Sequence, residues 1–251
     1  MKGQASQHYS YSTYADPKTA DSFDARRFGG PIGELIAAEQ ARVLAEFAGP
    51  FERRTVLDVG TGTGRAAFLL ARGGALVTGV DASEEMLRVA RARAAQEHAA
   101  VNFLVGDAHT LQFPDRSFDV VVCLRVVMHS PEWKAVIGEL CRTAKSLVIL
   151  DYPSSRSVAR LQSSARRVLH ALSINTEPYR VFPDRAIESE LAEHGFRVRS
   201  LHRQFVLPIG FHKLFGSPRM TQAVERILNR LGLLRLFGSP VTLVAERCVR
   251  S

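Results

Sequence analysis

The most informative residues for chemistry lie in the run VLDVGTGTGR at positions 56–65. Gly60, Gly62 and Gly64 follow a short β-rich segment and precede a helix-like one. Glycines at such a turn let the chain bend tightly and let a ligand approach the main chain. The spacing is G-x-G-x-G: a dinucleotide fingerprint needs a small residue where Arg65 stands, and the lysine of a phosphate-binding P-loop is missing. We therefore expect a nucleotide-like ligand without a pyrophosphate.

Two acidic residues follow at positions that suit a nucleoside. Asp81 ends the segment VTGVD about 20 residues after the glycines, where a carboxylate can accept hydrogen bonds from ribose hydroxyls. Asp107, in VGDA, ends the next β-rich segment and can accept a hydrogen from an adenine amino group. The alternatives are that Asp81 only caps the following helix and that Asp107 is an ordinary loop acid.

Alternating strands and helices would position these residues. This alternation over about 100 residues is typical of βαβ units, a parallel sheet and right-handed crossovers that put helices on both faces. The expected strands are 55–60, 75–81, 101–108, 118–126 and 146–152, and the expected helices are 31–47, 65–72, 82–99 and 133–144.

The two ends of the chain differ from this core. We expect an arm followed by a loop at 1–30, so that 1–54 is an N-terminal arm with a cap helix and 55–153 is the cofactor-binding core. Residues 154–183 are expected to form a basic helix and loop as a cap insertion. Residues 184–251 would complete the sheet, with a helix at 184–195, strands at 196–205 and 241–248, and a helical excursion at 206–240.

At this point the sequence resembles the class I S-adenosylmethionine-dependent methyltransferases. The resemblance rests on four motifs in order, VLDVGTGTG, VTGVDAS, VGDA and FDVVVCLRVVMHS, and covers 55–153 well and 184–251 loosely. It implies a Rossmann-like α/β fold with a seven-stranded sheet in the order 3-2-1-4-5-7-6. The last strand would be antiparallel, with helices on both faces and a helical cap.

The resemblance also implies a site for S-adenosylmethionine. Asp58 would support the loop and the methionine end, Asp81 would bind the ribose, and Asp107 would meet the polar edge of adenine. Arg125 and Val126 would face the methionine moiety. The complete implied set is Asp58, Gly60, Thr61, Gly62, Gly64, Asp81, Ala82, Met86, Asp107, Ala108, Arg125 and Val126.

Catalysis of methyl transfer needs orientation and exclusion of water more than a fixed set of residues, because the sulfonium is already a good leaving group. A base helps only where the acceptor keeps its proton. His129, just after the fourth strand, is the candidate base. A structural role at the helix entry Ser130-Pro131 is the alternative. No metal is expected, because no His/Cys cluster or acidic pair has ligand spacing.

The acceptor side is indicated by a fainter resemblance. Phe23, Asp24 and Arg27 look like the aromatic-Asp-x-x-Arg segment that precedes the first helix in small-molecule and quinone-type methyltransferases. We expect Tyr14 and Phe23 as lid aromatics, with ordinary packing as the alternative. The full expected acceptor set is Tyr14, Phe23, Arg27 and Tyr152.

Charge is distributed unevenly. Residues 154–251 carry 16 basic and 7 acidic side chains, and so hold all of the net charge of +8. This suits an anionic partner such as RNA, a lipid surface or an acidic substrate, or else a solvated arginine-rich surface. The Asn/Asp-Pro-Pro-aromatic segment of enzymes that methylate amino groups of bases is missing after the fourth strand. No DNA partner is expected, RNA stays open, and no oligomeric state is predicted.

Three cysteines without a CxxC pair fit a reducing cytoplasm, and no signal segment or membrane span is expected. The predicted function is transfer of a methyl group from S-adenosylmethionine to a small organic acceptor, first of all an aromatic or quinol-like hydroxyl or carbon. One alternative is an RNA methyltransferase that uses the basic C-terminal part. The other is a non-catalytic regulatory protein that binds S-adenosylmethionine.

Overall fold

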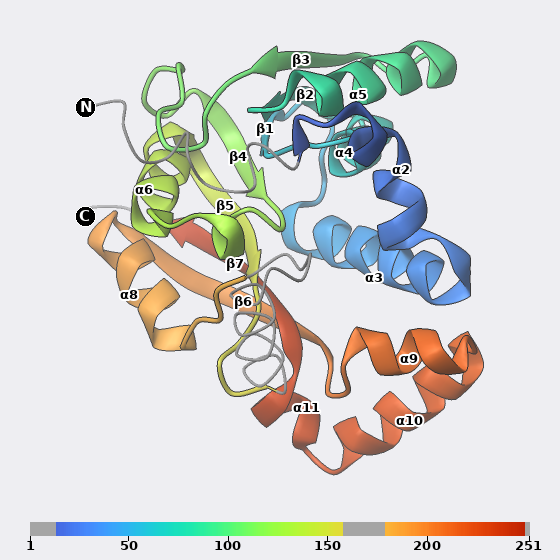
Figure 1. Cartoon of the computed structure of the whole chain (residues 1–251). Coiled ribbons are helices and arrows are strands. Elements are labelled where there is room, and N and C mark those ends of the chain that lie inside the picture. The colour runs from blue at the N-terminus through green and yellow to red at the C-terminus, as the bar shows by residue number, and fades with distance from the viewer. Residues whose placement is uncertain (1–13, 158–178, 249–251) are drawn as a thin grey trace.

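The computed structural model describes residues 14–157 and 179–248, in which seven strands form one sheet (Figure 1). The sheet order is β3-β2-β1-β4-β5-β7-β6. The strands are β1 (Thr55–Val59), β2 (Leu76–Asp81), β3 (Val101–Val105), β4 (Phe118–Cys123), β5 (Ala144–Tyr152), β6 (Phe196–Phe205) and β7 (Ser239–Arg247). Strands β1 to β5 run parallel to one another, and β7 lies between β5 and β6 and is antiparallel to both. The predicted order and the antiparallel last strand are confirmed.

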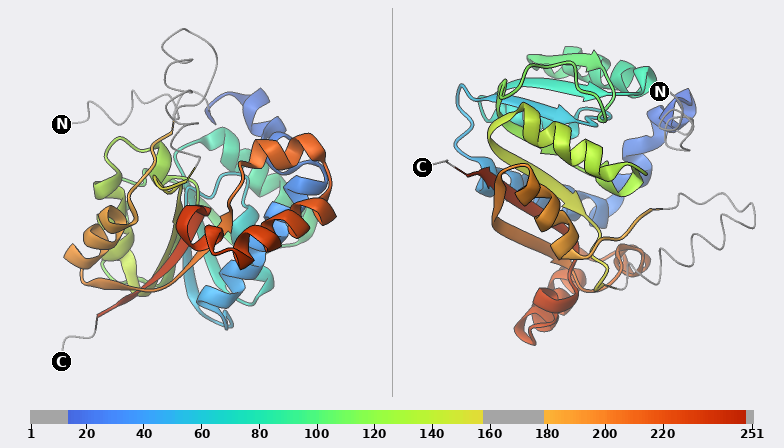
Figure 2. Two further views of the ribbon diagram at one scale, coloured as in Figure 1. Left: turned by 90° about the horizontal axis from the view of Figure 1, so that it is seen from below. Right: turned by 90° about the vertical axis from the view of Figure 1, so that its left-hand side faces the viewer.

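Helices cover both faces of this sheet (Figure 2). Alternation along β1 shows why, because Val56 packs into the core beneath α3, α4 and α5 whereas Leu57 packs into the core beneath α6 and α8. The helices are α2 (Pro17–Phe28), α3 (Gly30–Ala48), α4 (Arg65–Arg72), α5 (Glu84–Glu97), the 3-10 turn η2 (Val127–His129), α6 (Trp133–Thr143), α8 (Asp184–Glu193), α9 (Ile209–Phe215), α10 (Pro218–Arg230) and α11 (Leu233–Phe237).

The expectation of an arm and loop over 1–30 is wrong for residues 17–28, which form α2. The helix begins with Asp16, whose Oδ2 accepts a hydrogen bond from Thr19 N at 2.9 Å, and with Pro17 in the first turn. Only Ala20 and Phe28 of α2 are buried, so the sequence has no continuous apolar stripe to reveal a helix. Residues 1–13 lie outside the described residues.

Two predicted strands are shorter than expected. β3 ends at Val105 and β4 ends at Cys123, so the motif residues that follow each strand lie in loops at the carboxyl edge of the sheet. The predicted basic helix falls on 154–183, of which 158–178 lie outside the described residues. On either side of that gap, Ser154 bridges Phe182 in parallel.

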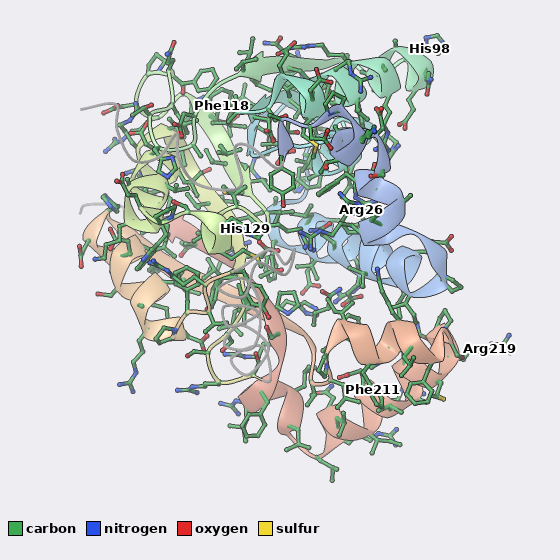
Figure 3. The ribbon with its side chains drawn as sticks, in the orientation of Figure 1. Arg26, His98, Phe118, His129, Phe211 and Arg219 are labelled. Carbon is green, nitrogen blue, oxygen red and sulfur yellow. The ribbon has the colours of Figure 1, made fainter. Side chains whose placement is uncertain are left out.

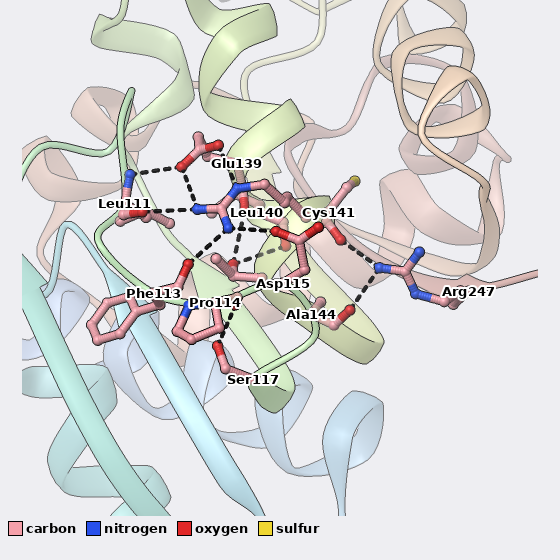
Figure 4. A network of polar contacts seen from close by, with 12 residues as sticks. Leu111, Phe113, Pro114, Asp115, Ser117, Glu139, Leu140, Cys141, Ala144 and Arg247 are labelled. Carbon is pink, nitrogen blue, oxygen red and sulfur yellow. Dashed lines mark hydrogen bonds and ion pairs between the residues drawn. The ribbon is translucent and has the colours of Figure 1, made fainter.

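The loop between β3 and β4 is held by α6 (Figure 4). Arg142 donates to the carbonyl oxygens of Leu111 at 2.8 Å and Phe113 at 2.7 Å, and it pairs with Asp115 at 2.8 Å. Glu139 accepts from Leu111 N at 2.7 Å. These bonds hold residues 111–115, the middle of the loop, against α6.

No helix in the described part of the chain is both long and apolar enough to cross a membrane.

Candidate functional site

A pocket of about 190 Å³ opens at the carboxyl ends of the parallel strands, between the sheet edge and α2. Ligands of open α/β sheets bind at this edge, where the strand order reverses beside β1. Most of the residues expected in a site come together here. They are Tyr14, Phe23, Arg27, Asp58, Gly60, Thr61, Gly62, Asp81, Ala82, Met86, Ala108, Arg125, Val126 and His129.

The glycine loop makes the floor of the pocket. Gly60, Gly62 and Gly64 have φ values of 69°, 55° and 84°, a region that residues with a Cβ rarely adopt. Gly60 N donates to Val80 O at 2.7 Å, which fixes the loop to β2. A Cβ on Gly60 would stand 2.1 Å from Val126 Cγ2. The glycine loop therefore packs so closely against Val126, after β4, that there is no room for a side chain at position 60.

Asp58, at the end of β1, supports this loop from below. Its Oδ2 accepts a hydrogen bond from Thr61 Oγ1 at 2.7 Å, and only 2% of the residue is exposed. Burial raises the pKa of Asp58 to about 6, the nearby Asp81 charge adds to the rise, and the hydrogen bond from Thr61 opposes it. The site thus holds a carboxyl group poised to change its charge near neutral pH.

Asp81 ends β2 and is bound by two backbone amides. Its Oδ2 accepts from Gly62 N at 2.8 Å and its Oδ1 accepts from Ser83 N at 2.9 Å. Burial raises the pKa of Asp81, and these two amide bonds work against that rise. Ser83 caps α5 by accepting from Met86 N at 3.1 Å, so the capping role belongs to Ser83 and leaves Asp81 facing the pocket.

Three side chains, Asp107, His109 and Ser130, form a hydrogen-bonded series on another side of the pocket. His109 Nδ1 lies 2.6 Å from Asp107 Oδ1, and His109 Nε2 lies 2.8 Å from Ser130 Oγ. A carboxylate only accepts, so Nδ1 donates to Asp107, and Nε2 shares a hydrogen bond with the Ser130 hydroxyl. His109 and Ser130 line the pocket, and Asp107 stands behind them. Sequence reasoning missed His109, although the D-x-H spacing after β3 was a signal that could have found it.

Helix α2 closes one wall of the pocket. Asp24 accepts from Thr63 Oγ1 at 2.9 Å and pairs with Arg93 at 2.6 Å, so α2 is tied to the glycine loop and to α5. Tyr14 O accepts from Ser83 Oγ at 2.6 Å, and the Tyr14 ring meets Phe23 edge to face at 5.9 Å. The two expected lid aromatics therefore lie side by side over the end of β2.

Arginines also contribute to that wall. The Arg65 guanidinium stacks over the Phe28 ring at 3.5 Å, and Arg125 lies 5.9 Å from the same ring. Burial lowers the pKa of Arg65. Its Nε is buried with no hydrogen-bond partner among the described residues. Phe28 and Arg65 were not in the predicted set, because their meeting depends on where α2 docks.

Three expected residues stand outside the lining. Gly64 caps α4, and its missing Cβ leaves room for Phe68, whose ring would lie 2.8 Å away. Asp107 acts from behind His109, as described above. Tyr152 is a correction: it is 1% exposed in the core, where its hydroxyl donates to Asp184 Oδ1 at 3.2 Å. Because it alternates with Asp151 on β5, it points to the face that α8 covers.

His129 lies in η2 on the loop that follows β4, near the middle of the molecule (Figure 3). Its main-chain amide donates to Val126 O at 2.9 Å, and 8% of the residue is exposed. The ring lines the pocket from the side opposite α2. Across residues 14–157 and 179–248, no group of three His, Cys, Asp or Glu side chains could hold a metal ion.

Residues 56–146 match the family model described as a methyltransferase domain. Among curated proteins, the domain is similar to the ubiquinone biosynthesis O-methyltransferase of Paramagnetospirillum magneticum, with 43% identity over 89 residues, 36% of this chain and 35% of that protein. The same enzyme of Hydrogenovibrio crunogenus is 30% identical over 52% of this chain and 57% of its own. The chain thus spans from a third to just over half of the length of these relatives.

Solved structures extend the likeness to the whole methyltransferase fold. Magnesium protoporphyrin IX methyltransferase from Synechocystis PCC 6803, solved with bound SAH, has a TM-score of 0.62 at 21% identity and covers 92% of this chain and 98% of its own. The [4+2]-cyclase SpnF has a TM-score of 0.61 at 19% identity and covers 84% of this chain and 82% of its own. Since methyltransferases share this fold with a cyclase, the fold alone does not decide the reaction.

Proposed function

We propose that the chain binds S-adenosylmethionine in this pocket and transfers its methyl group to a small organic acceptor, first of all an aromatic or quinol-like compound. One observation carries the proposal: Asp58, Asp81 and the glycine loop of a methyltransferase domain meet at one edge of the sheet beneath an aromatic cover.

The residues present fit the nucleoside. Each oxygen of Asp81 receives one backbone amide and keeps capacity for a further donor, as two ribose hydroxyls require. Met86 lines the same end of the pocket and offers an apolar contact for a purine ring. Gly60 and Gly62 line the pocket, so the main chain of the loop borders the space for the ligand.

The residues present also fit a methionine end with an amino and a carboxylate group. Asp58 offers a carboxylate beneath the loop. Arg65 lines the pocket, and its Nε is buried without a hydrogen-bond partner among the described residues, so its guanidinium can bind a ligand carboxylate. The acidic Asp58 and the basic Arg65 would thus bind the amino group and the carboxylate of the methionine end.

When bound, S-adenosylmethionine supplies a methyl group on a positively charged sulfur that leaves readily. The chain contributes orientation and exclusion of water. Asp81 and the glycine loop fix the nucleoside, and Tyr14 and Phe23 on the α2 side shield the reacting end. His129 holds or accepts the proton of an acceptor hydroxyl at its ring nitrogen.

The acceptor class rests on the wall made by α2 and on the relatives. Phe23 and Phe28 give this wall an apolar surface, and Arg27 adds a positive charge. Leu124, which follows β4, adds a further apolar side chain to the pocket lining. The named ubiquinone O-methyltransferases support a quinol-like acceptor. Apolar surface with few polar groups suits a planar aromatic compound.

The test is transfer of isotopically labelled methyl groups from the donor to a metabolite extract and to a panel of catechols and quinols. Label in a low-molecular-mass aromatic product supports the proposal. Binding of S-adenosylhomocysteine by calorimetry without any label transfer would instead make the protein a cofactor-binding regulator. Label found only in RNA would favour the RNA methyltransferase alternative.

A further inference from the structure

The excursion between β6 and β7, which forms α9, α10 and α11, presents apolar side chains to solvent. Twelve large apolar side chains of the described residues are exposed, and eight of them lie between residues 211 and 237. Leu214 is 81% exposed and Leu231 is 68% exposed. Single exposed apolar residues are ordinary, but such a concentration on one excursion marks an interaction surface.

The inward side of the same excursion contains a buried polar cluster, beside Ile209, which packs against an apolar cluster with Phe28 and Phe205. His212 is buried between Glu225, 2.9 Å from its Nε2, and Thr221, 3.2 Å from its Nδ1. Glu225 also accepts from the backbone amides of Val206 at 2.8 Å and Leu207 at 3.0 Å. These bonds fix α9 and α10 to the end of β6. On α10 the buried residues are the polar Thr221 and Glu225, whereas Met220 and Ile227 are exposed, which is the reverse of a helix that packs its apolar face inward.

Two separate rows of side chains run along α10. Met220, Ile227 and Leu231 are exposed and are spaced i, i+7 and i+11, which places them within about 40° of one another around the helix. Arg219, Arg226 and Arg230 repeat the same spacing and form a second row about 100° away. An exposed apolar row beside an arginine row is typical of a helix that lies in a membrane interface.

Charge on the excursion has one sign. Lys213 and Arg235 join the three arginines of α10 as exposed cations, and Arg219 projects from the tip of α10 (Figure 3). Glu225 is the only acidic residue between 209 and 237, and its carboxylate is buried on the inward side. The outward surface is thus apolar and uniformly positive.

We propose that α9, α10 and α11 form a docking surface for an anionic lipid bilayer. The apolar side chains would enter the headgroup boundary while the arginines meet lipid phosphates. A second copy of the chain fits poorly, because a twofold contact would set these cations against the same cations. RNA fits less well, because five of the eight exposed apolar side chains are aliphatic or thioether and only Phe211, Phe215 and Phe237 offer rings on which bases could stack.

The docking surface is connected to the pocket wall. Lys213 Nζ donates to the carbonyl oxygens of Arg26 at 3.2 Å and Arg27 at 3.1 Å, at the end of α2. Arg27 and Phe28 in turn line the pocket. An acceptor that dissolves in the bilayer would reach the protein on the side where α2 covers the site. The docking inference itself does not depend on the proposed methyl transfer.

The test is sedimentation of the full chain with vesicles of phosphatidylcholine alone and of phosphatidylcholine mixed with phosphatidylglycerol. We expect binding to the mixed vesicles only, and release at high salt. Arg226→Ala and Arg230→Ala should each weaken binding about fivefold. Leu214→Ser and Ile227→Ser should also weaken binding. Each of these variants alters a solvent-exposed side chain, so each should keep the far-ultraviolet circular dichroism spectrum of the native chain.

Matched controls lie elsewhere on the surface. Arg185→Ala on α8 removes the same charge, and Leu76→Ser at the start of β2 removes the same exposed apolar group. Neither should change vesicle binding. The proposal is overturned if the full chain ignores anionic vesicles, or if the controls weaken binding as much as the α10 variants. Two other results would also overturn it. One is that the chain forms a dimer that does not bind vesicles and that Leu214→Ser dissociates. The other is that the surface binds RNA oligonucleotides but no vesicles.

Discussion

The carboxylate of Asp81 and the backbone amide of Gly62 are joined by a hydrogen bond of 2.8 Å. The acid at the end of β2 therefore sets the shape of the glycine loop after β1 while it faces the pocket. A change at Asp81 should therefore alter both the loop conformation and the proposed binding of the ligand.

Replacing Asp81 by Asn should weaken binding of S-adenosylhomocysteine about 10- to 100-fold, because hydrogen bonds to a charged acceptor contribute about 1.5–3 kcal/mol. Calorimetry would measure the change. Asp21→Asn, at an exposed carboxylate paired with Arg88, is the matched control and should leave the affinity unaltered. Equal affinity of Asp81→Asn and the native chain would remove Asp81 from the site.

Substituting Ala for Gly60 should destabilise the fold and the site together. The φ of 69° costs an L-residue about 1–2 kcal/mol, and the new Cβ would overlap Val126. Urea unfolding should show a loss of at least about 1 kcal/mol. Gly210→Ala in α9 meets no atom within 4 Å and has an ordinary φ, so it should be neutral or stabilising.

The pKa of Asp58, raised by burial to about 6, predicts a specific dependence of stability on pH. Between pH 4 and 6 the folded state keeps a proton that the unfolded state releases, so the free energy of unfolding falls as pH rises through this window. The shift corresponds to on the order of 3 kcal/mol. Asp58→Asn should flatten the fall, measured by urea unfolding at several pH values. An unchanged slope in this variant would assign the effect to Asp81 and Asp151, whose pKa values burial also raises.

The chain from Asp107 through His109 to Ser130 should control recognition of adenine. We expect the native protein to prefer S-adenosylhomocysteine over its inosine analogue, which has a carbonyl group in place of the amino group, by about tenfold. Asp107→Asn should abolish this preference, and Ser130→Ala should reduce it, because the far end of the chain then no longer orients His109. Ser200→Ala, at an exposed position on β6, serves as the control. A preference that survives Asp107→Asn would contradict this role.

His129→Asn distinguishes a base from a structural residue. If His129 takes the proton of an acceptor hydroxyl, turnover should fall about 100-fold or more while the affinity for S-adenosylhomocysteine stays within about twofold. His98→Asn is a suitable control, since His98 ends α5 with a φ of 50°, which Asn tolerates. Full turnover in His129→Asn would show that the ring only holds the loop after β4.

The sequence alone determined the sheet and the floor of the site. Alternating β and α segments predicted the parallel core of the sheet, whereas the full strand order came from the resemblance of the motifs to a known family. Asp58, Gly60 and Asp81 sit at strand ends that parallel pairing must bring together, so the spacing of these residues was enough to predict that they meet. The glycines were also recognisable from the sequence, because glycine has no Cβ and readily adopts the positive φ values that this loop requires.

Only the tertiary structure decided which residues form the walls of the pocket. Helix α2 has almost no apolar stripe, and its place follows from the contact of Asp24 with Thr63, 39 residues away. Arg65 meets Phe28, and His109 meets Ser130, only because separate elements dock on one edge. Tyr152 was expected in the pocket but is buried in the core. Side chains alternate between the two faces of a strand, so Tyr152 points to the opposite face of β5 from Asp151. Contacts of this kind depend on how elements pack, and a pattern along one chain does not specify that packing.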